Sequence, residues 1–399
     1  MKSNWKKVKL SDICDVRDGT HDSPKRTAEG RFLITSKHIK GGKIDLSSAY
    51  KISLKDFDMV NQRSKVDQWD ILLSMIGTIG EVCIVKEEPD FAIKNVGLIK
   101  TNDEILSLYL YYYLKTPTAQ SDILARLKGT TQQYLSLGEI RSFPISIPQD
   151  DRVMRKITKI LSSIDDKIEL NNKINRNLEA QAQAIFKSWF IDFEPFKSSK
   201  FIDSELGKIP EGWKVGKLSD IANITMGQSP NGNSYNEKKI GMIFFQGRAE
   251  FGWRFPRNRL YTTAPKRIAE RDSVLLSIRA PVGDINKTLE RCCIGRGLAS
   301  LTSNHKTFLY YKMQSIRHLL DVYNGEGTVF GSINKNTLQE IRTIIPIDSE
   351  IIRFELKLKV VDELIRNNYI ENLRLIKLRD TLLPELMSGK IDILRFSNR

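Results

Sequence analysis

Cysteine, histidine and long apolar runs are scarce in this sequence, and each scarcity excludes a class of protein. The four cysteines form no CxxC pair and no cluster with histidine, so neither a zinc site nor a disulfide framework is predicted. The four histidines are scattered without an HxxxH spacing, which disfavours metal or general-base roles. No apolar stretch approaches the roughly 18 residues of a membrane span, and the first residues lack the apolar run of a signal peptide. We therefore expect a cytoplasmic protein.

The motifs of DNA-modifying enzymes are also missing. An amino-methyltransferase needs a glycine-rich cofactor loop and an Asn/Asp-Pro-Pro-aromatic turn that holds the flipped base. None of the 13 prolines follows another proline. The sequence therefore disfavours a self-contained methylase. It predicts that this chain is not an enzyme and that it holds neither a cofactor nor a metal.

Positive charge, in contrast, is plentiful. The 63 Lys and Arg residues outnumber the 48 Asp and Glu residues, and the net charge of +15 favours a polyanionic partner. The excess is uneven: residues 1–150 hold 22 basic and 19 acidic side chains, a net of +3, whereas residues 197–349 hold 23 and 14, a net of +9. The second half is therefore predicted to bind phosphates more strongly.

Two long amphipathic helices are predicted, because apolar residues recur at steps of three and four in 150–193 and again in 349–390. We expect the two apolar stripes to pack against each other as an antiparallel coiled coil. Asn171-Asn172 and Asn367-Asn368 would then fix the register. The alternative is a coiled coil that only dimerises the chain. The stripes are Ile157, Leu161, Ile164, Ile168, Ile174, Leu178 and Ile185 in the first helix and Ile352, Leu356, Val360, Leu364, Ile370, Leu373 and Ile376 in the second.

The chain contains an internal duplication. Residues 5–13 read WKKVKLSDI, and 208 positions later residues 213–221 read WKVGKLSDI. In both halves the same features then follow in the same order: an apolar strand that ends at a glycine turn, an aromatic helix and a polar glycine loop, 129–133 or 325–328. A Glu-Ile-Arg triplet and one of the long helices complete each half. A tandem repeat of about 200 residues predicts two domains rather than a solenoid.

Several local motifs accompany this plan. The first long helix ends in FKSWF and DFEPF, the linker to the second half reads LGKIPEGWK, and the second long helix closes with LPELMSGKI. In this order and spacing, the chain resembles the DNA-specificity subunit of type I restriction-modification systems over essentially its whole length. The first domain departs from the pattern, because it keeps only the tryptophan of the LGxIPxGW segment at its start.

The resemblance implies an α+β fold with two tandem mixed α/β target-recognition domains, related by a pseudo-twofold axis and joined by the antiparallel coiled coil. Residues 1–149 and 197–348 would hold the domains, the second with its hinge, 150–196 and 349–390 the helices, and 391–399 a tail. Each domain would read one half of a bipartite double-stranded DNA site, while the helices act as a spacer and dock two methyltransferase subunits. S-adenosylmethionine, ATP and magnesium are expected in partner subunits, which include two restriction subunits where the host has them.

Polar side chains in and around glycine loops are the candidates for DNA contact, because amides, hydroxyls and guanidinium groups can bond to base edges or phosphates. They suit ordinary turns equally well. We expect replacement of Arg254 and Arg257 by alanine to flatten the dependence of log affinity on log salt, by about 0.9 per lost contact. The candidates are Thr20, His21, Lys25, Arg26, Ser36, Lys37, Lys128, Thr130, Thr131, Gln132 and Gln133 in the first domain and Gln228, Ser229, Asn231, Asn233, Gln246, Arg248, Arg254, Arg257, Asn334 and Lys335 in the second.

A structural or architectural protein that binds DNA without sequence preference is the alternative function. It would share the basic charge and the two domains. A specificity subunit differs because it keeps a specific complex in the presence of excess random duplex. The sequence does not predict the target bases, because loop residues have no one-to-one code with base pairs.

Overall fold

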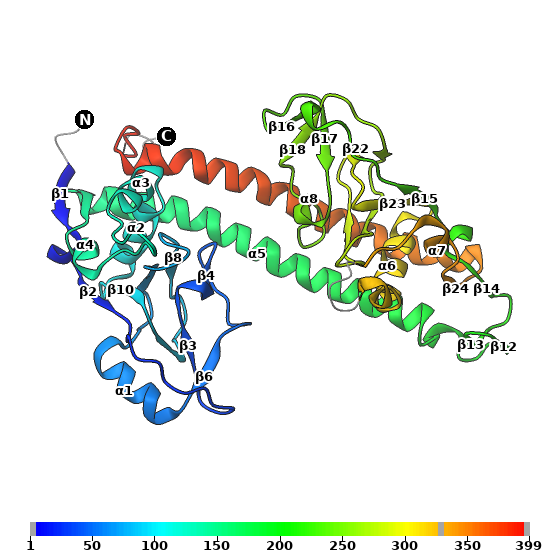
Figure 1. The fold of residues 1–399 in the computed structure, drawn as a ribbon, viewed down its shortest axis with the longest axis horizontal. Helices are drawn as coiled ribbons and strands as arrows, with labels where there is room; N and C mark the ends of the chain where they lie inside the picture. Colours follow the sequence, from blue (N-terminus) through cyan, green and yellow to red (C-terminus); the bar gives the residue numbers. More distant parts are fainter. Residues whose placement is uncertain (1–4, 326–330, 395–399) are drawn as a thin grey trace. The chain divides into compact units, whose positions relative to one another are not determined.

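The computed structural model describes residues 5–325 and 331–394, and its internal contacts divide the chain into two compact units (Figure 1). Unit 1 is Met1–Asn171 with Ile370–Arg399, and unit 2 is Asn172–Tyr369. Each unit combines one α/β domain with one part of each of two long helices. Within the described residues, no helix is both long and apolar enough to cross a membrane.

The domain of unit 1 is built on a four-stranded antiparallel sheet and a three-stranded mixed sheet. The first has the order β2-β10-β7-β8, with β2 (Asp15–Asp18), β10 (Val96–Lys100), β7 (Ile71–Ser74) and β8 (Val82–Ile84). The second has the order β6-β3-β9, with β6 (Tyr50–Ile52), β3 (Arg31–Ile34) and β9 (Phe91–Ile93), and β3 is parallel to β9. The remaining elements are β1 (Trp5–Lys9) paired with β11 (Pro144–Pro148), β4 (Ile39–Lys40) paired with β5 (Lys43–Ile44), the 3-10 helices η2 (Leu10–Asp12) and η3 (Ser36–His38), and helices α1 (Leu54–Ser64), α2 (Glu104–Leu114), α3 (Pro117–Ala125) and α4 (Leu137–Arg141).

The domain of unit 2 repeats this plan. Its four-stranded sheet has the order β15-β23-β20-β21, with β15 (Asn223–Met226), β23 (Leu298–Thr302), β20 (Val274–Ser277) and β21 (Ile285–Lys287). Its second sheet has the order β16-β18-β17-β22-β19, with β16 (Tyr235–Asn236), β18 (Leu260–Thr262), β17 (Met242–Phe245), β22 (Cys292–Ile294) and β19 (Ile268–Ala269). The remaining elements are β12 (Phe201–Ser204) paired with β13 (Gly207–Pro210), β14 (Lys214–Lys217) paired with β24 (Arg342–Ile345), helices α6 (Lys306–Ser315) and α7 (Lys335–Gln339), and the 3-10 helices η4 (Glu194–Phe196), η5 (Leu218–Asp220), η6 (Gly232–Ser234), η7 (Arg248–Glu250) and η8 (Arg317–Asn324).

The two domains therefore share one topology, and the predicted α+β fold of two tandem mixed domains is confirmed. The order β2-β10-β7-β8 corresponds to β15-β23-β20-β21, and the parallel pair β3–β9 corresponds to β17–β22. The four-stranded sheets bury nearly every residue of their central strands, because each sheet is covered on both faces. This equivalence allows positions on the matched strands, and in the segments next to them, to be compared between the two domains.

The long helices are α5 (Asp151–Phe190) and α8 (Asp348–Met387), each 40 residues or about 60 Å in length. In unit 1, Asn171 Nδ2 donates to Asn372 Oδ1 at 2.9 Å, and Arg379 pairs with Asp165 at 2.7 Å. Residue numbers fall along α8 as they rise along α5, so the two helices run antiparallel there. The buried asparagine contact lies on the packed face, as the coiled-coil interpretation predicts.

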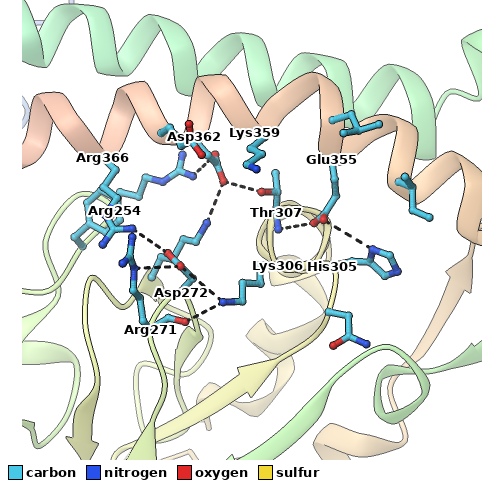
Figure 2. Close-up of a pocket in the computed structure, with 16 residues that line it drawn as sticks. Arg254, Arg271, Asp272, His305, Lys306, Thr307, Glu355, Lys359, Asp362 and Arg366 are labelled. Atoms are coloured by element: carbon cyan, nitrogen blue, oxygen red, sulfur yellow. Dashed lines mark hydrogen bonds and ion pairs between the residues drawn. The ribbon is translucent and has the colours of Figure 1, made fainter.

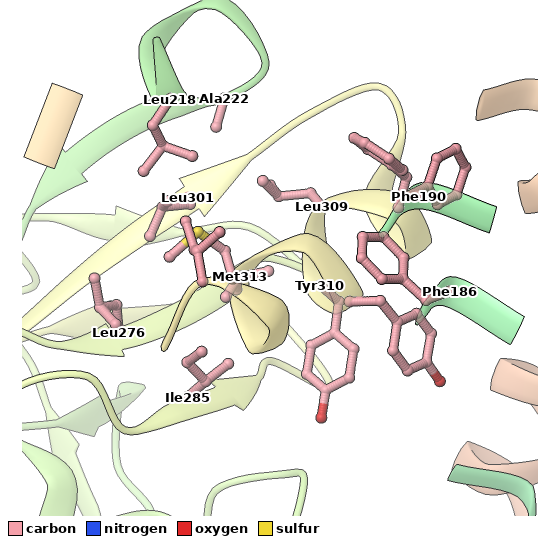
Figure 3. Packing of buried hydrophobic residues seen from close by; sticks show 14 of the residues in the cluster. Phe186, Phe190, Leu218, Ala222, Leu276, Ile285, Leu301, Leu309, Tyr310 and Met313 are labelled. Carbon is pink, nitrogen blue, oxygen red and sulfur yellow. The ribbon is translucent and has the colours of Figure 1, made fainter. Parts of the chain in front are cut away.

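In unit 2 the same two helices pack around aromatic side chains. Figure 3 shows Phe186 and Phe190 of α5 directed into the domain core, beside residues of α6. The ring of Phe190 lies 5.0 Å from that of Phe354 in α8 and 5.1 Å from that of Phe308 in α6. Asn368 Nδ2 donates to Asn175 Oδ1 at 2.9 Å, which gives the helices an antiparallel register in this unit too.

The predicted packing stripe of α8 is wrong in unit 2. Ile352, Leu356, Val360 and Leu364 are exposed, and Leu356 keeps 71% of its surface accessible. The buried positions of α8 in this unit are instead Ile351, Phe354, Leu358 and Ile365. Both sets of apolar residues in α8 recur at steps that keep them on one face of a helix, and the set that contains Phe354 buries the larger side chain. In unit 1 Leu373 and Ile376 are exposed as well, and in α5 the prediction holds for Ile157, Leu161 and Ile164 but not for Ile174.

The C-terminal end of α8 closes unit 1. Gly389 has φ +68°, its N–H bonds to Leu386 O, and the N–H of Lys390 bonds to Glu385 O, so the helix ends in a Schellman motif. A side chain at Gly389 would collide with the indole of Trp5 in β1. The two ends of the described chain therefore pack together in unit 1, where Leu383, Leu386 and Met387 join the core of the first domain.

Candidate nucleic-acid interface

In unit 1, nine of the eleven predicted DNA-contact residues cluster at one edge of the two sheets, and Lys25 and Arg26 lie outside it. We call this edge rim 1 and define it as 19–21, 35–37, 75–80, 94–95 and the loop 128–134. Strands β2, β3, β7 and β9 end at this edge, and β8 and β10 begin there. Backbone hydrogen bonds connect its segments: Asn95 N donates to Thr20 O at 3.2 Å, and Leu135 N donates to Met75 O at 2.9 Å. The structure thus brings together segments more than 100 residues apart in sequence.

Two of the candidates serve the structure of rim 1 itself. Ser36 is buried, and its hydroxyl donates to Asn95 O at 3.0 Å and accepts from Met75 N at 3.3 Å. Thr20 is also buried, and its hydroxyl accepts from Asp22 N at 3.1 Å. The prediction that these hydroxyls contact DNA is therefore wrong for this structure, because both are covered and already bonded.

The loop 128–134 is the most exposed polar segment of rim 1. Lys128 and Tyr134 close it with two backbone hydrogen bonds of 2.9 Å each. Thr130, Thr131, Gln132 and Gln133 are exposed, and within the described residues their side chains have no hydrogen-bond partner. These four candidates stay predictions, with donors and acceptors available for a ligand.

The charged candidates of unit 1 differ in how far their charge is already neutralised. Lys25 and Lys37 are exposed and have no ion-pair partner in the described chain. Lys128 Nζ lies 3.1 Å from a carboxylate oxygen of Glu139, and the guanidinium of Arg26 stacks 4.9 Å above the ring of Tyr50. The ring of His21 contacts Asp18 and Asn95, so its nitrogens are occupied. Lys25 and Lys37 are the most available cations of this group.

Unit 2 has an equivalent edge, rim 2, formed by 227–229, 246–248, 278–283, 295–297 and 331–334. Gly297 N donates to Gln246 O at 3.3 Å, Ile278 N to Gly297 O at 3.0 Å, and Ile333 N to Ile278 O at 3.1 Å. The bridge between Ile76 and Tyr134 in rim 1 is matched by one between Arg279 and Ser332 in rim 2. Most of the second polar glycine loop, 325–328, lies outside the described residues, which resume at position 331.

The candidates in unit 2 also fall into an engaged and an available group. Ser229 Oγ accepts from Arg296 N at 3.2 Å, Asn334 Oδ1 caps α7 by accepting from Thr337 N at 2.9 Å, and Arg248 pairs with Asp284 at 2.7 Å. The available side chains are exposed, and their roles stay predictions. They are Gln228, Asn231, Asn233, Gln246, Arg257 and Lys335.

The prediction that Arg254 contacts DNA is wrong, because only 1% of the surface of this residue is exposed. Its guanidinium pairs with Glu179 of α5 and, at 2.5 Å, with Asp362 of α8. It also donates to Tyr311 Oη of α6 at 3.1 Å and lies 4.5 Å from the centre of the Tyr310 ring. Arg254 therefore ties the domain of unit 2 to both long helices and cannot reach DNA from this position.

Asp362 is the centre of this junction (Figure 2). Its second carboxylate oxygen accepts from Lys287 Nζ and from Thr307 Oγ1, both at 3.0 Å. Burial opposes ionisation of Asp362, but the adjacent Arg254 and Lys287 hold its pKa below the ordinary value. The junction is therefore an ionised, hydrogen-bonded network. It borders a cavity of about 530 Å³ whose wall includes Arg271, Lys306 and Arg366.

Sequence reasoning missed four exposed or rim-forming residues: Lys94 and Asn95 in rim 1 and Arg279 and Arg296 in rim 2. Arg279 and Arg296 are exposed, and in the described part of the chain neither has an ion-pair partner. The internal repeat carried the signal, because aligning β9 with β22 pairs Asn95 with Arg296. Aligning β7 with β20 pairs Ile76 with Arg279.

The titratable groups elsewhere have structural roles. Burial raises the pKa of the Cys14 and Cys83 thiols to about 12, so neither forms a thiolate near neutral pH. Within the described residues, no group of three or more His, Cys, Asp or Glu side chains could hold a metal ion. The chemistry that the rims offer is hydrogen bonding and charge.

Comparison with known proteins agrees with a recognition role. Residues 2–180 and 210–378 match the family described as "Type I restriction modification DNA specificity domain". The fold and the two rims define a tandem DNA-specificity protein, and the chain belongs to this family. The resemblance predicted from the sequence is confirmed. Specificity subunits of these systems are non-catalytic, and the catalytic activities lie in other subunits.

Relatives cover nearly the whole chain. A protein of Methanocaldococcus jannaschii assigned as the type I restriction enzyme MjaX specificity subunit is 31% identical over 98% of this chain and 94% of its own length. The MjaIX specificity subunit of the same organism is 29% identical over 98% and 94%, respectively. The crystal structure of a type I restriction-modification S subunit from M. genitalium has a TM-score of 0.61 at 18% identity and covers 96% of both chains, which shows a shared fold.

Proposed function

We propose that each unit reads one half of a bipartite double-stranded DNA site through its rim, and that α5 and α8 set the spacing between the halves. The observation that carries the proposal is the repeated rim. Equivalent backbone hydrogen bonds recur in both units, such as Leu135 N to Met75 O and Ile333 N to Ile278 O, while the exposed side chains differ. A fixed scaffold with exchanged polar side chains suits two readers of different sequences.

The long helices supply the surface for assembly. Ile352, Leu356, Val360 and Leu364 form an exposed apolar stripe on the part of α8 that belongs to unit 2. Such a stripe is costly in water and marks a surface that another protein covers. We assign it, together with the exposed Leu373 and Leu378 in unit 1, to two methyltransferase subunits.

The proposal places the remaining chemistry in the partners. S-adenosylmethionine would be bound by the methyltransferase subunits, and ATP and magnesium by restriction subunits where the host has them. The assembly would act on DNA in the cytoplasm. The apolar stripe of α8 also leads us to expect that the isolated chain is poorly soluble.

Competition by random DNA tests the proposal. The chain, assembled with its methyltransferase partners, is bound to a labelled duplex that carries a site taken from the methylation map of host DNA. Excess random duplex should leave the specific complex intact, because specific binding exceeds non-specific binding by about 10³-fold or more. Equal loss of the mapped site and of a scrambled duplex would instead support the architectural alternative.

A further inference from the structure

We propose that Arg279 and Arg296 of unit 2 read guanine bases in one half of the DNA site. The proposal rests on the function proposed above, because it assigns side chains and a base to rim 2. Both residues are exposed on this rim, and their backbones are held by hydrogen bonds that the rest of the domain supplies.

Arg296 projects from a rigid turn between two glycines. Gly295 N donates to Phe245 O at 2.8 Å, and Arg296 N donates to Ser229 Oγ at 3.2 Å. A Cβ atom added to Gly295 or Gly297 would lie only 2.8 or 3.0 Å from Gln246 O, so a larger residue on either side would strain the turn. The turn thus fixes the backbone of Arg296 and leaves its side chain in solvent.

Arg279 occupies a neighbouring position on the same rim. Ala280 N donates to Gly331 O at 3.0 Å, and Arg279 itself forms an antiparallel bridge with Ser332. The preceding residue, Ile278, donates its N–H to Gly297 O at 3.0 Å. Ile278 is the residue before Arg279, and Gly297 is the residue after Arg296. This hydrogen bond therefore holds the backbones of the two arginines close together.

Within the described residues, the guanidinium groups of this pair have no carboxylate partner, whereas nearby cations do. Arg248 and Arg317 both pair with Asp284, at 2.7 and 2.6 Å. Among the residues that the structure describes, no carboxylate lies within ion-pair distance of Arg279 or Arg296. Two unpaired guanidinium groups on one rigid edge are available for an external acceptor.

The residues at the equivalent positions of rim 1 indicate whether the two arginines contact bases or phosphates. The position equivalent to Arg279 is Ile76, which forms the matching bridge with Tyr134, and the alignment of β9 with β22 pairs Arg296 with Asn95. Phosphates are identical in every half-site, so a phosphate contact would favour a cation in both units. A guanidinium in one unit and an alkyl or amide group in the other is the pattern expected where the two half-sites present different base edges.

Guanine is the base that fits a guanidinium fork. Its O6 and N7 atoms accept two parallel N–H bonds in the major groove, and this is the commonest specific contact of arginine with DNA. Rim 2 should therefore read a half-site with guanine at the positions that these two side chains reach. An amide such as that of Asn95 suits adenine instead.

The test measures affinity in the complete methyltransferase complex, on a duplex with the mapped site and on a random duplex. Arg279→Ala and Arg296→Ala should each weaken binding to the mapped site by about 10- to 100-fold while leaving the random duplex nearly unchanged. Arg291→Ala is the matched control, because Arg291 is an exposed arginine of unit 2 outside rim 2, already paired with Glu270. It should change neither affinity.

The base is identified with 7-deazaguanine, which lacks the N7 acceptor. Its substitution in one half-site should weaken the wild-type complex and cause no further loss in the variant whose arginine contacts that guanine. Both variants should map to the same half-site. Equal losses on both duplexes, with a salt slope lower by about 0.9, would assign phosphate contacts instead and overturn the proposal. Unchanged affinities, or effects in different half-sites, would also overturn it. A wild-type complex without any site preference would refute the proposed function itself.

Discussion

Each unit contains an aspartate at the same position of its long helix, but the arginine that pairs with it comes from a different part of the structure. In unit 1, Asp165 of α5 pairs at 2.7 Å with Arg379 of α8, and Tyr112 of α2 donates to it at 2.9 Å. In unit 2, Asp362 occupies the matching position of α8 and pairs with Arg254 from the domain. The carboxylate is the same in both repeats, but its partner is a helix residue in one and a loop residue in the other.

The difference shows two ways of fixing a recognition domain to the helices. The domain of unit 1 contacts Asp165 through a tyrosine hydroxyl, and the charge is balanced between the helices themselves. The domain of unit 2 inserts a guanidinium between Glu179 and Asp362, and this ion network is buried. The attachment of the domain of unit 2 should therefore depend more on a single residue.

The largest expected effect comes from removing this cation. Arg254→Met should destabilise unit 2 by about 3–5 kcal/mol, because Glu179 and Asp362 would be left buried beside too little positive charge. Arg379→Met should cost unit 1 only about 1 kcal/mol, since Asp165 and Arg379 are partly exposed. Hydrogen exchange of α6 and α2 against urea measures the two units separately.

A double replacement controls this experiment. Adding Glu179→Gln to Arg254→Met should recover part of the stability, because it removes one of the two stranded carboxylates. Because Arg254 is buried in this network, we now expect its replacement to change the stability of unit 2 rather than the salt dependence of DNA binding. Equal destabilisation of both units by the two single variants would show that burial of the network has no influence.

The second prediction is that the length of the long helices sets the spacing between the two half-sites, because each unit binds its own half-site. Four residues inserted between Asn171 and Asn172, with four more between Tyr369 and Ile370, lengthen both helices at the boundary of the units by about 6 Å, nearly one turn. At about 3.4 Å per base pair, the unread gap should grow by about one or two base pairs. A methylation map of the assembled variant measures the gap. New half-site bases with the old gap would mean that the helices themselves read sequence.

The third prediction compares the acceptors that cap the turns after β3 and β17. His38 Nδ1 accepts from Thr35 N at 2.9 Å, and burial lowers the pKa of His38 from its ordinary 6.5. A backbone hydrogen bond with Ser48 and the charge of Asp45 oppose this shift, whereas Lys37 and Lys40 add to it. The unfolded chain then binds the proton more readily. The contribution of neutral His38 to stability is complete above about pH 6.5 and is lost as pH falls through the lowered folded pKa.

In unit 2 the equivalent acceptor is the carboxylate of Glu250, which bonds to Gly247 N at 3.4 Å. Acidification from pH 7.5 to 5.5 should therefore loosen the segment after β3 more than the one after β17. Amide exchange in the two segments checks this. His38→Gln keeps an acceptor that does not titrate and should remove the difference; a persistent difference would exclude His38 as its source.

The smallest expected effect concerns phosphate contacts at the rims. Lys37 is an exposed cation on rim 1, and Lys335 is an exposed cation directly after the last segment of rim 2; neither has an ion pair among the described residues. Replacing either by alanine should reduce the slope of log affinity against log salt by about 0.9, equally for specific and random duplexes. A change in one variant alone would show that only one unit uses its rim lysine for DNA.

Repeats and periodicity were readable in the sequence, whereas long-range charge pairing was not. The WKKVKLSDI repeat predicted the shared topology, and the spacing of Ile157, Leu161 and Ile164 predicted a buried face of α5 correctly. Arg254 was misassigned because it lies in a basic and aromatic stretch typical of nucleic-acid loops. The acids that neutralise it are 75 and 108 residues away, and no local pattern reveals them.

Closure of unit 1 by Gly389 against Trp5 has a consequence for the order of folding during synthesis. Unit 2 is a continuous stretch, Asn172–Tyr369, and all of it leaves the ribosome before the last part of α8. Unit 1 emerges first but lacks Leu383, Leu386 and Met387 until the last part of α8 has been synthesised. The second unit can therefore finish folding before the first, and a nascent chain keeps the apolar side of the first domain open until its final turn of helix arrives.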